Sequence, residues 1–146
     1  MALKRPTVAE ADSPPPFNQA YFDTVFLVPN PPEAWPRQFA IVTAHNPDGA
    51  LAVDKANDQA ARALDRYLRD EGIESFAVVG ASPDLHHHEA GRGFAAAYLE
   101  TAATVSRKFR QEAFFWVEDG VVYLCIDESG RGWRMANWND RLRRSH

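Results

Sequence analysis

The chain has 146 residues, 45% of them hydrophobic, which is enough to bury a core without disulfides. Its net charge of −4 at pH 7 argues against a general nucleic-acid-binding protein, because such proteins usually carry excess positive charge. The single cysteine excludes an internal disulfide and predicts a reducing, cytoplasmic location, and no apolar run approaches the roughly 20 residues of a membrane span.

The chain begins with a proline-rich segment. Residues 1–16 contain four prolines and no hydrophobic period, which is typical of a flexible leader. A single domain is therefore expected over 17–146. Strands are predicted at 23–28 and 39–45, and the second is a nearly continuous apolar run, as in a central strand. An Asn-Pro-Asp-Gly turn follows it, so polar groups gather where this strand ends.

Helices and strands alternate after this turn. Apolar residues recur at helical spacing over 54–71, which predicts a helix that ends at Gly72. A strand is expected at 75–81, then a polar loop with three consecutive histidines. A short strand at 92–97 and a second helix at 99–109 follow.

The C-terminal third predicts a hairpin and a short helix. Strands at 112–117 and 121–126 flank Asp119-Gly120, a strong turn signal, and residues 133–144 fit a short amphipathic helix. The order of elements predicts an α+β fold. We expect a two-layer sandwich, in which two helices pack on one face of a single mixed sheet of about five to six strands.

The chain resembles a bacterial family catalogued as domain of unknown function 3293. The resemblance is carried by Ile41-Val42-Thr43-Ala44-His45-Asn46-Pro47, by Asn57, Gly80, Glu89 and Phe94, and by Phe109-Arg110-Gln111-Glu112-Ala113. It implies a small bacterial α+β domain, and it implies no particular activity.

Three amides form the first candidate site. Asn57 lies at the edge of the apolar stripe of its helix, where an unmatched buried amide would cost about 1–3 kcal/mol. One interpretation is that Asn57 only braces the turn at Asn46. The other is that Asn46, Asn57 and Gln111 point their amides, together with Thr43, into a shared strand-end pocket.

Arg92 is the candidate cation of this pocket. It stands between Gly91 and Gly93, a sequence typical of a flexible loop, and a guanidinium can hold a carboxylate or phosphate with two hydrogen bonds. The alternative is a surface salt bridge. Our leading hypothesis is a small anionic ligand, oriented by the residues of the amide site and neutralised by Arg92.

The three-histidine loop is the candidate for metal or proton-transfer chemistry. Adjacent side chains diverge, so an exposed polar loop is favoured over a metal site at His86 and His88. No cofactor is predicted, because no nucleotide-binding glycine motif is present. The sequence leaves open whether the protein is an enzyme; if it is, His45, His88 and Glu89 are the candidates for proton transfer.

The last segment, 129–146, is basic. It holds five arginines and one aspartate, a local charge of +4, so the rest of the chain carries −8. This pattern is typical of a solvated tail. It also supports the rival hypothesis, a protein–protein interaction module that binds a partner through Trp133, Trp138 and the tail. Nucleic-acid binding through the tail is the third hypothesis, disfavoured by the acidic body.

Overall fold

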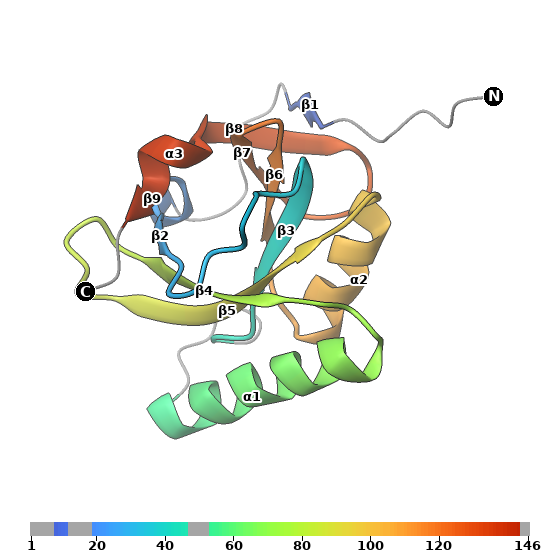
Figure 1. Cartoon of the computed structure of the whole chain (residues 1–146). Helices are drawn as coiled ribbons and strands as arrows, with labels where there is room; N and C mark the ends of the chain where they lie inside the picture. The colour runs from blue at the N-terminus through green and yellow to red at the C-terminus, as the bar shows by residue number, and fades with distance from the viewer. Residues whose placement is uncertain (1–7, 12–18, 47–52, 144–146) are drawn as a thin grey trace.

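The computed structural model describes residues 8–11, 19–46 and 53–143, which form one mixed sheet covered by short helices (Figure 1). The strands are β1 (Ala9–Glu10), β2 (Val25–Leu27), β3 (Gln38–Thr43), β4 (Phe76–Ala81), β5 (His88–Ala95), β6 (Phe114–Glu118), β7 (Val121–Cys125), β8 (Arg131–Asn137) and β9 (Leu142–Arg143). The helices are the 3-10 helix η1 (Gln19–Asp23), α1 (Asp54–Asp70), α2 (Leu99–Lys108) and α3 (Trp138–Arg141). The strand order is β1-β8-β7-β6-β3-β5-β4-β2-β9.

The connectivity forces this sheet to curl. Strands β8 and β9 stand second and ninth in the order, which in a flat sheet would separate them by about 34 Å. Only α3 joins them, and five residue steps span at most about 18 Å even when fully extended. In Figure 1, α3 accordingly lies beside β8 and leads directly into β9 next to β2.

An aromatic contact inside the curl confirms the curvature. Phe26 of β2 and Phe115 of β6 lie on strands four positions apart, a separation of about 19 Å in a flat sheet. Their ring centroids are 4.9 Å apart. The sheet therefore has a concave face, which packs against itself, and an outer face.

The pleat of the central strand divides the core between these two faces. Ala40 and Val42 of β3 pack with Leu64 of α1 and Ala102 of α2, on what we call the helix face. Phe39 and Ile41 alternate with them and contribute to a second cluster with Phe26, Phe115 and Trp138 on the concave face. Both sides of β3 are buried, which is why its sequence is continuously apolar.

The predicted fold class, a two-layer sandwich with a sheet of about five to six strands, is wrong. The sheet has nine strands instead of about five to six, and it curls on itself instead of forming the flat layer of a two-layer sandwich with two helices on one face. The sequence patterns missed β1, β8 and β9. Two of these have two residues each, too few to show a period, and the third lies where a helix was expected.

Several local predictions are confirmed. Helix α1 covers Asp54–Asp70, and Gly72 closes it with a φ of 72° while Ile73 N–H donates to Leu68 O, as in a Schellman ending. The hairpin turn lies at Asp119 and Gly120, both with positive φ, and Glu118 pairs with Val121. Val53 is the N-cap residue of α1, and no side-chain hydrogen bond caps the helix there.

The described residues near both ends of the chain form strands that the sequence did not predict. Of the predicted leader, residues 1–7 and 12–16 lie outside the described residues, but Ala9–Glu10 form β1, which pairs in parallel with β8. The expected helix at 133–144 is mostly β8, α3 and β9, and Arg144 lies outside the described residues. Within the part of the chain that is described, no helix has the length and apolar character needed to cross a membrane.

Candidate functional site

A pocket of about 260 Å³ opens on the concave face at the end of β3, and we call it the strand-end pocket. Thr43 of β3 pairs with Gly91 of β5, and Gly80 of β4 pairs with Glu89 of β5, so these residues share one face of the sheet. Helix η1 and the segment before β6 complete the walls. The polar lining side chains are those of Tyr21, Thr24, Thr43, His45, Asn46, Ser82, His87, Glu89, Gln111 and Glu112.

The structure brings together part of the sequence-predicted set. Thr43, His45, Asn46, Glu89 and Gln111 line the strand-end pocket, whereas Asn57, His88 and Arg92 do not. The pairing of β3, β4 and β5 therefore gathers residues that are far apart in the sequence. Arg92, the cation predicted for this pocket, is not among them.

Gln111 fixes one wall of the pocket. The Thr43 hydroxyl donates to Gln111 Oε1 at 3.0 Å, and Gln111 Nε2 donates to the carbonyl oxygens of His45 and Phe109, each at 3.0 Å. Both hydrogens of this amide are thus used inside the protein. Gln111 holds the β3 end against the segment before β6 and has no donor left for an anionic ligand.

Asn57 braces Asn46 from behind the pocket. Asn46 has a φ of 45°, in the left-handed region that asparagine tolerates better than most residues. Its backbone N–H donates to Asn57 Oδ1 at 2.9 Å, and Asn57 Nδ2 donates to Asn46 Oδ1 at 3.1 Å. Asn57 is 5% exposed within α1. These hydrogen bonds are the ones expected if Asn57 braces the turn at Asn46.

Two carboxylates and a phenol set the electrostatics of the pocket. Tyr21 Oη donates to Glu112 Oε2 at 3.3 Å. Burial, followed by the nearby charges of Glu112 and Glu89, raises the pKa of Tyr21 to about 12. No lysine or arginine is among the described residues that line the pocket. The pocket therefore favours positive charge and hydrogen-bond donors over anions.

Two histidines, His45 and His87, supply further polar groups. His87 Nε2 lies 3.6 Å from Glu89 Oε1. His45 Nδ1 is buried and makes no hydrogen bond to the described part of the chain. His88, which the sequence favoured, is exposed on β5, and the pleat turns its side chain to the face opposite Glu89. His87 thus takes the place predicted for His88.

Metal chemistry finds no support among the described residues. No group of three or more histidine, cysteine, aspartate or glutamate side chains there is arranged to hold a metal ion. His86 instead lies 3.6 Å from Asp84, in an exposed loop. Cys125 is buried, and burial raises the pKa of its thiol to about 12, so it is packed rather than reactive.

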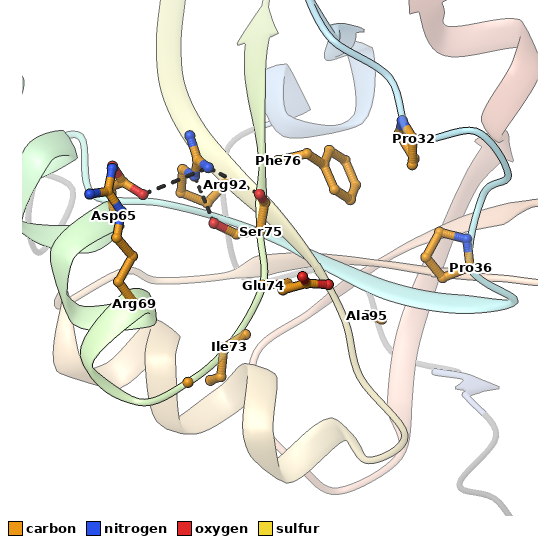
Figure 2. A pocket seen from close by; sticks show the side chains of 11 residues that line it. Pro32, Pro36, Asp65, Arg69, Ile73, Glu74, Ser75, Phe76, Arg92 and Ala95 are labelled. Carbon is orange, nitrogen blue, oxygen red and sulfur yellow. Dashed lines mark hydrogen bonds and ion pairs between the residues drawn. The ribbon is translucent and has the colours of Figure 1, made fainter.

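The Arg92 side chain points to the helix face and lines a different cavity, at the start of β4 (Figure 2). Residues 91–93 are not a loop: they are the middle of β5, and Arg92 pairs with Val42, whose side chain is on the helix face. The flanking glycines are required by close packing. A Cβ at Gly91 would stand 2.7 Å from Val42 O, and one at Gly93 would stand 2.5 Å from the Phe76 ring.

Sequence reasoning did not select Tyr21, Ser82, His87 or Glu112 as site residues. Glu112 follows Gln111 directly, and His87 lies two residues before Glu89, so strand alternation would have indicated His87 had β5 been predicted to begin earlier. No sequence pattern indicated Tyr21 as a site residue, because it is 91 residues from Glu112 and reaches the pocket only through the curl of the sheet.

The predicted partner surface is only partly exposed, because one of its two tryptophans is buried. Trp138 is 2% exposed and packs against Phe26, Phe39 and Trp35. Arg141 Nη1 donates to the carbonyl oxygens of Phe22 and Thr24, at 2.6 and 3.0 Å. Trp133 is partly exposed on β8. Residues 131–143 thus form β8, α3 and β9 and are not a free basic tail.

Comparison with known proteins gives a family and no activity. No curated protein and no solved structure matches the chain. The model of the family described as "Protein of unknown function (DUF3293)" matches residues 42–114, half of the chain, from β3 to the first residue of β6. This range contains the Thr43–Gln111 and Asn46–Asn57 hydrogen bonds that build the pocket wall. The chain belongs to this family of proteins of unknown function.

Proposed function

We propose that the strand-end pocket binds a small molecule bearing a positive charge, such as a primary amine. The observation that carries the proposal is the pairing of Glu89 and Glu112 around Tyr21, in a pocket without a lysine or arginine among its described lining residues. Glu89 is partly enclosed, with 28% of its side chain exposed, and it attracts a cation more strongly than an exposed carboxylate does, because less water screens it. Glu112 is exposed and adds a second negative charge beside it. The earlier expectation of an anionic ligand required Arg92, which lies elsewhere.

The rigid wall supports a binding role. Gln111, Thr43 and the Asn46–Asn57 pair hold the end of β3 in one conformation before any ligand arrives. A preformed wall lowers the ordering cost of binding. The phenol of Tyr21 and the imidazole of His45 then offer polar contacts beside the carboxylates.

A matched series of probes tests the sign of the charge. Butylamine, butan-1-ol and butyrate have the same carbon chain and differ in charge. We expect butylamine to shift the amide NMR signals of Gly80, Glu89 and Glu112, and butyrate to leave them unchanged. Butyrate binding as tightly as butylamine would refute the proposal.

Variants locate the probe within the pocket. Glu112→Gln and Glu89→Gln each remove one charge and should weaken butylamine binding about tenfold, since a charged hydrogen bond contributes about 1.5–3 kcal/mol. Glu128→Gln is the matched control, because Glu128 is exposed, pairs with Arg107 and does not line the pocket. Equal weakening by all three variants would indicate a general surface charge effect.

Other roles stay predictions. If the bound molecule is transformed, Glu89 with His87 is the pair placed for proton transfer, 3.6 Å apart. A protein partner at the C-terminal segment would contact Trp133 and exposed arginines, since Trp138 is buried. A cytoplasmic location remains the prediction from the single, unpaired cysteine.

A further inference from the structure

The lining of the strand-end pocket offers a ligand many hydrogen-bond acceptors and few donors. Four of its side chains carry a hydroxyl group, namely those of Tyr21, Thr24, Thr43 and Ser82. A hydroxyl group has one hydrogen to donate and two lone pairs that accept. The direction of the hydrogen bond that it already makes therefore decides what it can offer a ligand.

Two of these hydroxyl groups donate to carboxylates. The Tyr21 hydroxyl donates to Glu112 Oε2 at 3.3 Å, and the Ser82 hydroxyl donates to Asp84 Oδ1 at 2.6 Å. An ionised carboxylate can only accept, so the hydrogen in each bond comes from the hydroxyl group. Both hydroxyl groups can therefore offer a ligand only an acceptor oxygen.

The two threonines also donate to oxygens that carry no hydrogen. The Thr24 hydroxyl donates to the carbonyl oxygen of Ala20 at 3.4 Å, and the Thr43 hydroxyl donates to Gln111 Oε1 at 3.0 Å. The orientation of the Gln111 amide is fixed, because its Nε2 donates to two backbone carbonyl oxygens. All four hydroxyl groups of the lining thus spend their hydrogens inside the protein.

Carboxylates add to this excess of acceptors. Glu89 and Glu112 line the pocket, and both lie close enough to the Tyr21 phenol to raise its pKa. Apart from Gln111, the described lining side chains that carry an N–H group are those of His45, Asn46 and His87. A ligand that satisfies this lining must therefore bring several hydrogens of its own.

Gly80 leaves space between two of the acceptors. It pairs with Glu89 on the neighbouring strand, and a Cβ at Gly80 would stand 3.5 Å from Thr24 Cγ2 on its other side. Because Gly80 has no side chain, the carboxylate of Glu89 and the hydroxyl of Thr24 flank a bare stretch of backbone in the pocket. A flat polar group fits such a place better than a bulky one.

The surroundings of these acceptors are partly apolar. Ala20, Ala81 and Phe115 line the same pocket, and Glu89 is 28% exposed. A cation that enters therefore gives up part of its hydration shell. A guanidinium group does so more readily than an ammonium group, because it is more weakly hydrated.

We propose that the cation bound in the strand-end pocket is a guanidinium group, as in an alkylguanidine. This inference rests on the proposed function and names the head group that the pocket recognises. A guanidinium on one alkyl chain has five N–H donors in a plane, whereas a primary ammonium has three. One edge pairs with the Glu89 carboxylate, and the remaining N–H groups donate to hydroxyl oxygens of the lining, that of Thr24 among them.

Three cations with the same butyl chain test this proposal. Butylguanidine brings five N–H donors, butylamine brings three and butyltrimethylammonium brings none, while all three are positively charged at neutral pH. Titrations of the full chain are followed by the amide NMR signals of Gly80, Glu89 and Glu112. They should rank the ligands in this order, with a loss of about tenfold or more from the first to the last.

The outcomes distinguish this proposal from the proposed function. Butyltrimethylammonium binding as tightly as butylguanidine would mean that the pocket recognises charge without hydrogen bonds, which overturns the guanidinium assignment and leaves a cation site. Butylamine binding more tightly than butylguanidine has the same consequence. If none of the three cations binds more tightly than butyrate, the proposed function and the guanidinium assignment both fail.

Removal of one acceptor gives an independent test. Thr24→Val keeps the branched shape of the side chain and removes its oxygen, so it should weaken butylguanidine binding severalfold and leave butyltrimethylammonium binding unchanged. Thr101→Val is the matched control, because Thr101 is exposed on α2 and does not line the pocket. It should change neither affinity. Equal weakening of both ligands by Thr24→Val would show that no hydrogen bond to this oxygen distinguishes them, and would overturn the proposal.

Discussion

At the scale of single residues, the amides of the family motif support the backbone of the pocket. Gln111 satisfies two carbonyl oxygens and one hydroxyl, and Asn57 satisfies the backbone and side chain of Asn46. The sequence indicated that these residues meet, because Asn57 stood at the edge of an apolar stripe next to a strand-end turn. It could not show which groups they bond, since that depends on side-chain orientation in the folded chain.

The Asn46–Asn57 brace predicts a stability change. Asn57→Ala removes two hydrogen bonds from a residue that is 5% exposed, and we expect the free energy of unfolding to fall by about 1–3 kcal/mol. Chemical denaturation measures this directly. Gln59→Ala is the matched control, an exposed amide on the same helix whose loss should change stability by at most about 0.5 kcal/mol. Equal effects of the two changes would contradict the brace.

Tyr21 predicts a pH dependence at the alkaline end. Its pKa is about 12 in the folded protein against an ordinary value of 10.0, mainly because burial disfavours the phenolate. Below pH 10 both the folded and the unfolded chain keep the proton, so the contribution of Tyr21 to stability is fully present. Between about pH 10 and about pH 12 the unfolded chain loses the proton more readily, and stability falls as pH rises.

Replacement of Tyr21 tests this window. Tyr21→Phe should make the alkaline loss of stability shallower than in the unmodified protein, as measured by denaturation at a series of pH values. Glu112→Gln should lower the pKa of Tyr21 only in part, because burial is the larger cause. The near-ultraviolet absorbance of phenolate reports that pKa. If Tyr21→Phe leaves the alkaline slope as steep as before, the phenol is not the group responsible.

At the scale of elements, local patterns predicted those whose signals are local. Helices α1 and α2 and the β6–β7 hairpin have periodicity or a turn sequence within a few residues. Strand β8 has no such signal: Arg131–Asn137 is half polar, and its pairing with β7 contains a register shift near Val122 and Tyr123. Gly91 and Gly93 were misread as loop residues because their purpose, close approach of neighbouring chains, depends on pairing that sequence does not show.

The close approach at Gly91 predicts a specific intolerance. Gly91→Ala would place a Cβ 2.7 Å from the backbone oxygen of Val42, which cannot move without breaking the β3–β5 register, so we expect a loss of about 1–3 kcal/mol. Thermal or chemical unfolding measures it. Gly80→Ala is the matched control on β4, because its Cβ would meet Thr24 Cγ2 at 3.5 Å and Glu89 O at 3.9 Å, both ordinary contacts. Comparable losses at both glycines would refute this steric explanation.

At the scale of the whole molecule, the curl of the sheet decides where the functional groups go. It brings Tyr21 to Glu112, across 91 residues, and Phe26 to Phe115. The pleat then sends Arg92 to one face and Glu89 to the other. The sequence predicted a polar centre at the end of β3, since its strand and turn are local. It predicted a positive charge there, supplied by Arg92, whereas the lining residues carry negative charge, and it did not predict the second cavity, because both features follow from long-range closure.

Helix α3 is the element that closes the sheet, and Trp138 is its anchor. The Trp138 backbone N–H donates to Gly120 O at 2.8 Å, while Arg141 binds the chain before β2, so α3 ties the β6–β7 turn to the opposite edge. Trp138 also packs on Phe26 and Phe39, at 5.2 and 5.3 Å between ring centroids. We therefore expect Trp138 to contribute more to closure than the β2–β9 pairing, which joins only Phe26 with Leu142 and Leu27 with Arg143.

Trp138→Ala should accordingly lower the free energy of unfolding by about 3–5 kcal/mol, the usual cost of truncating a buried aromatic residue. Hydrogen exchange should show where the loss falls. Protection of Phe26 and Leu27, at the β2–β9 edge, should decrease first, and protection of Phe115 and Trp116 in the sheet centre should persist longer. Trp133→Ala, at a partly exposed position on β8, should cost less and leave β2 protected. Uniform loss of protection across all strands in Trp138→Ala would mean that the sheet unfolds as one unit and that α3 is not its separate closure.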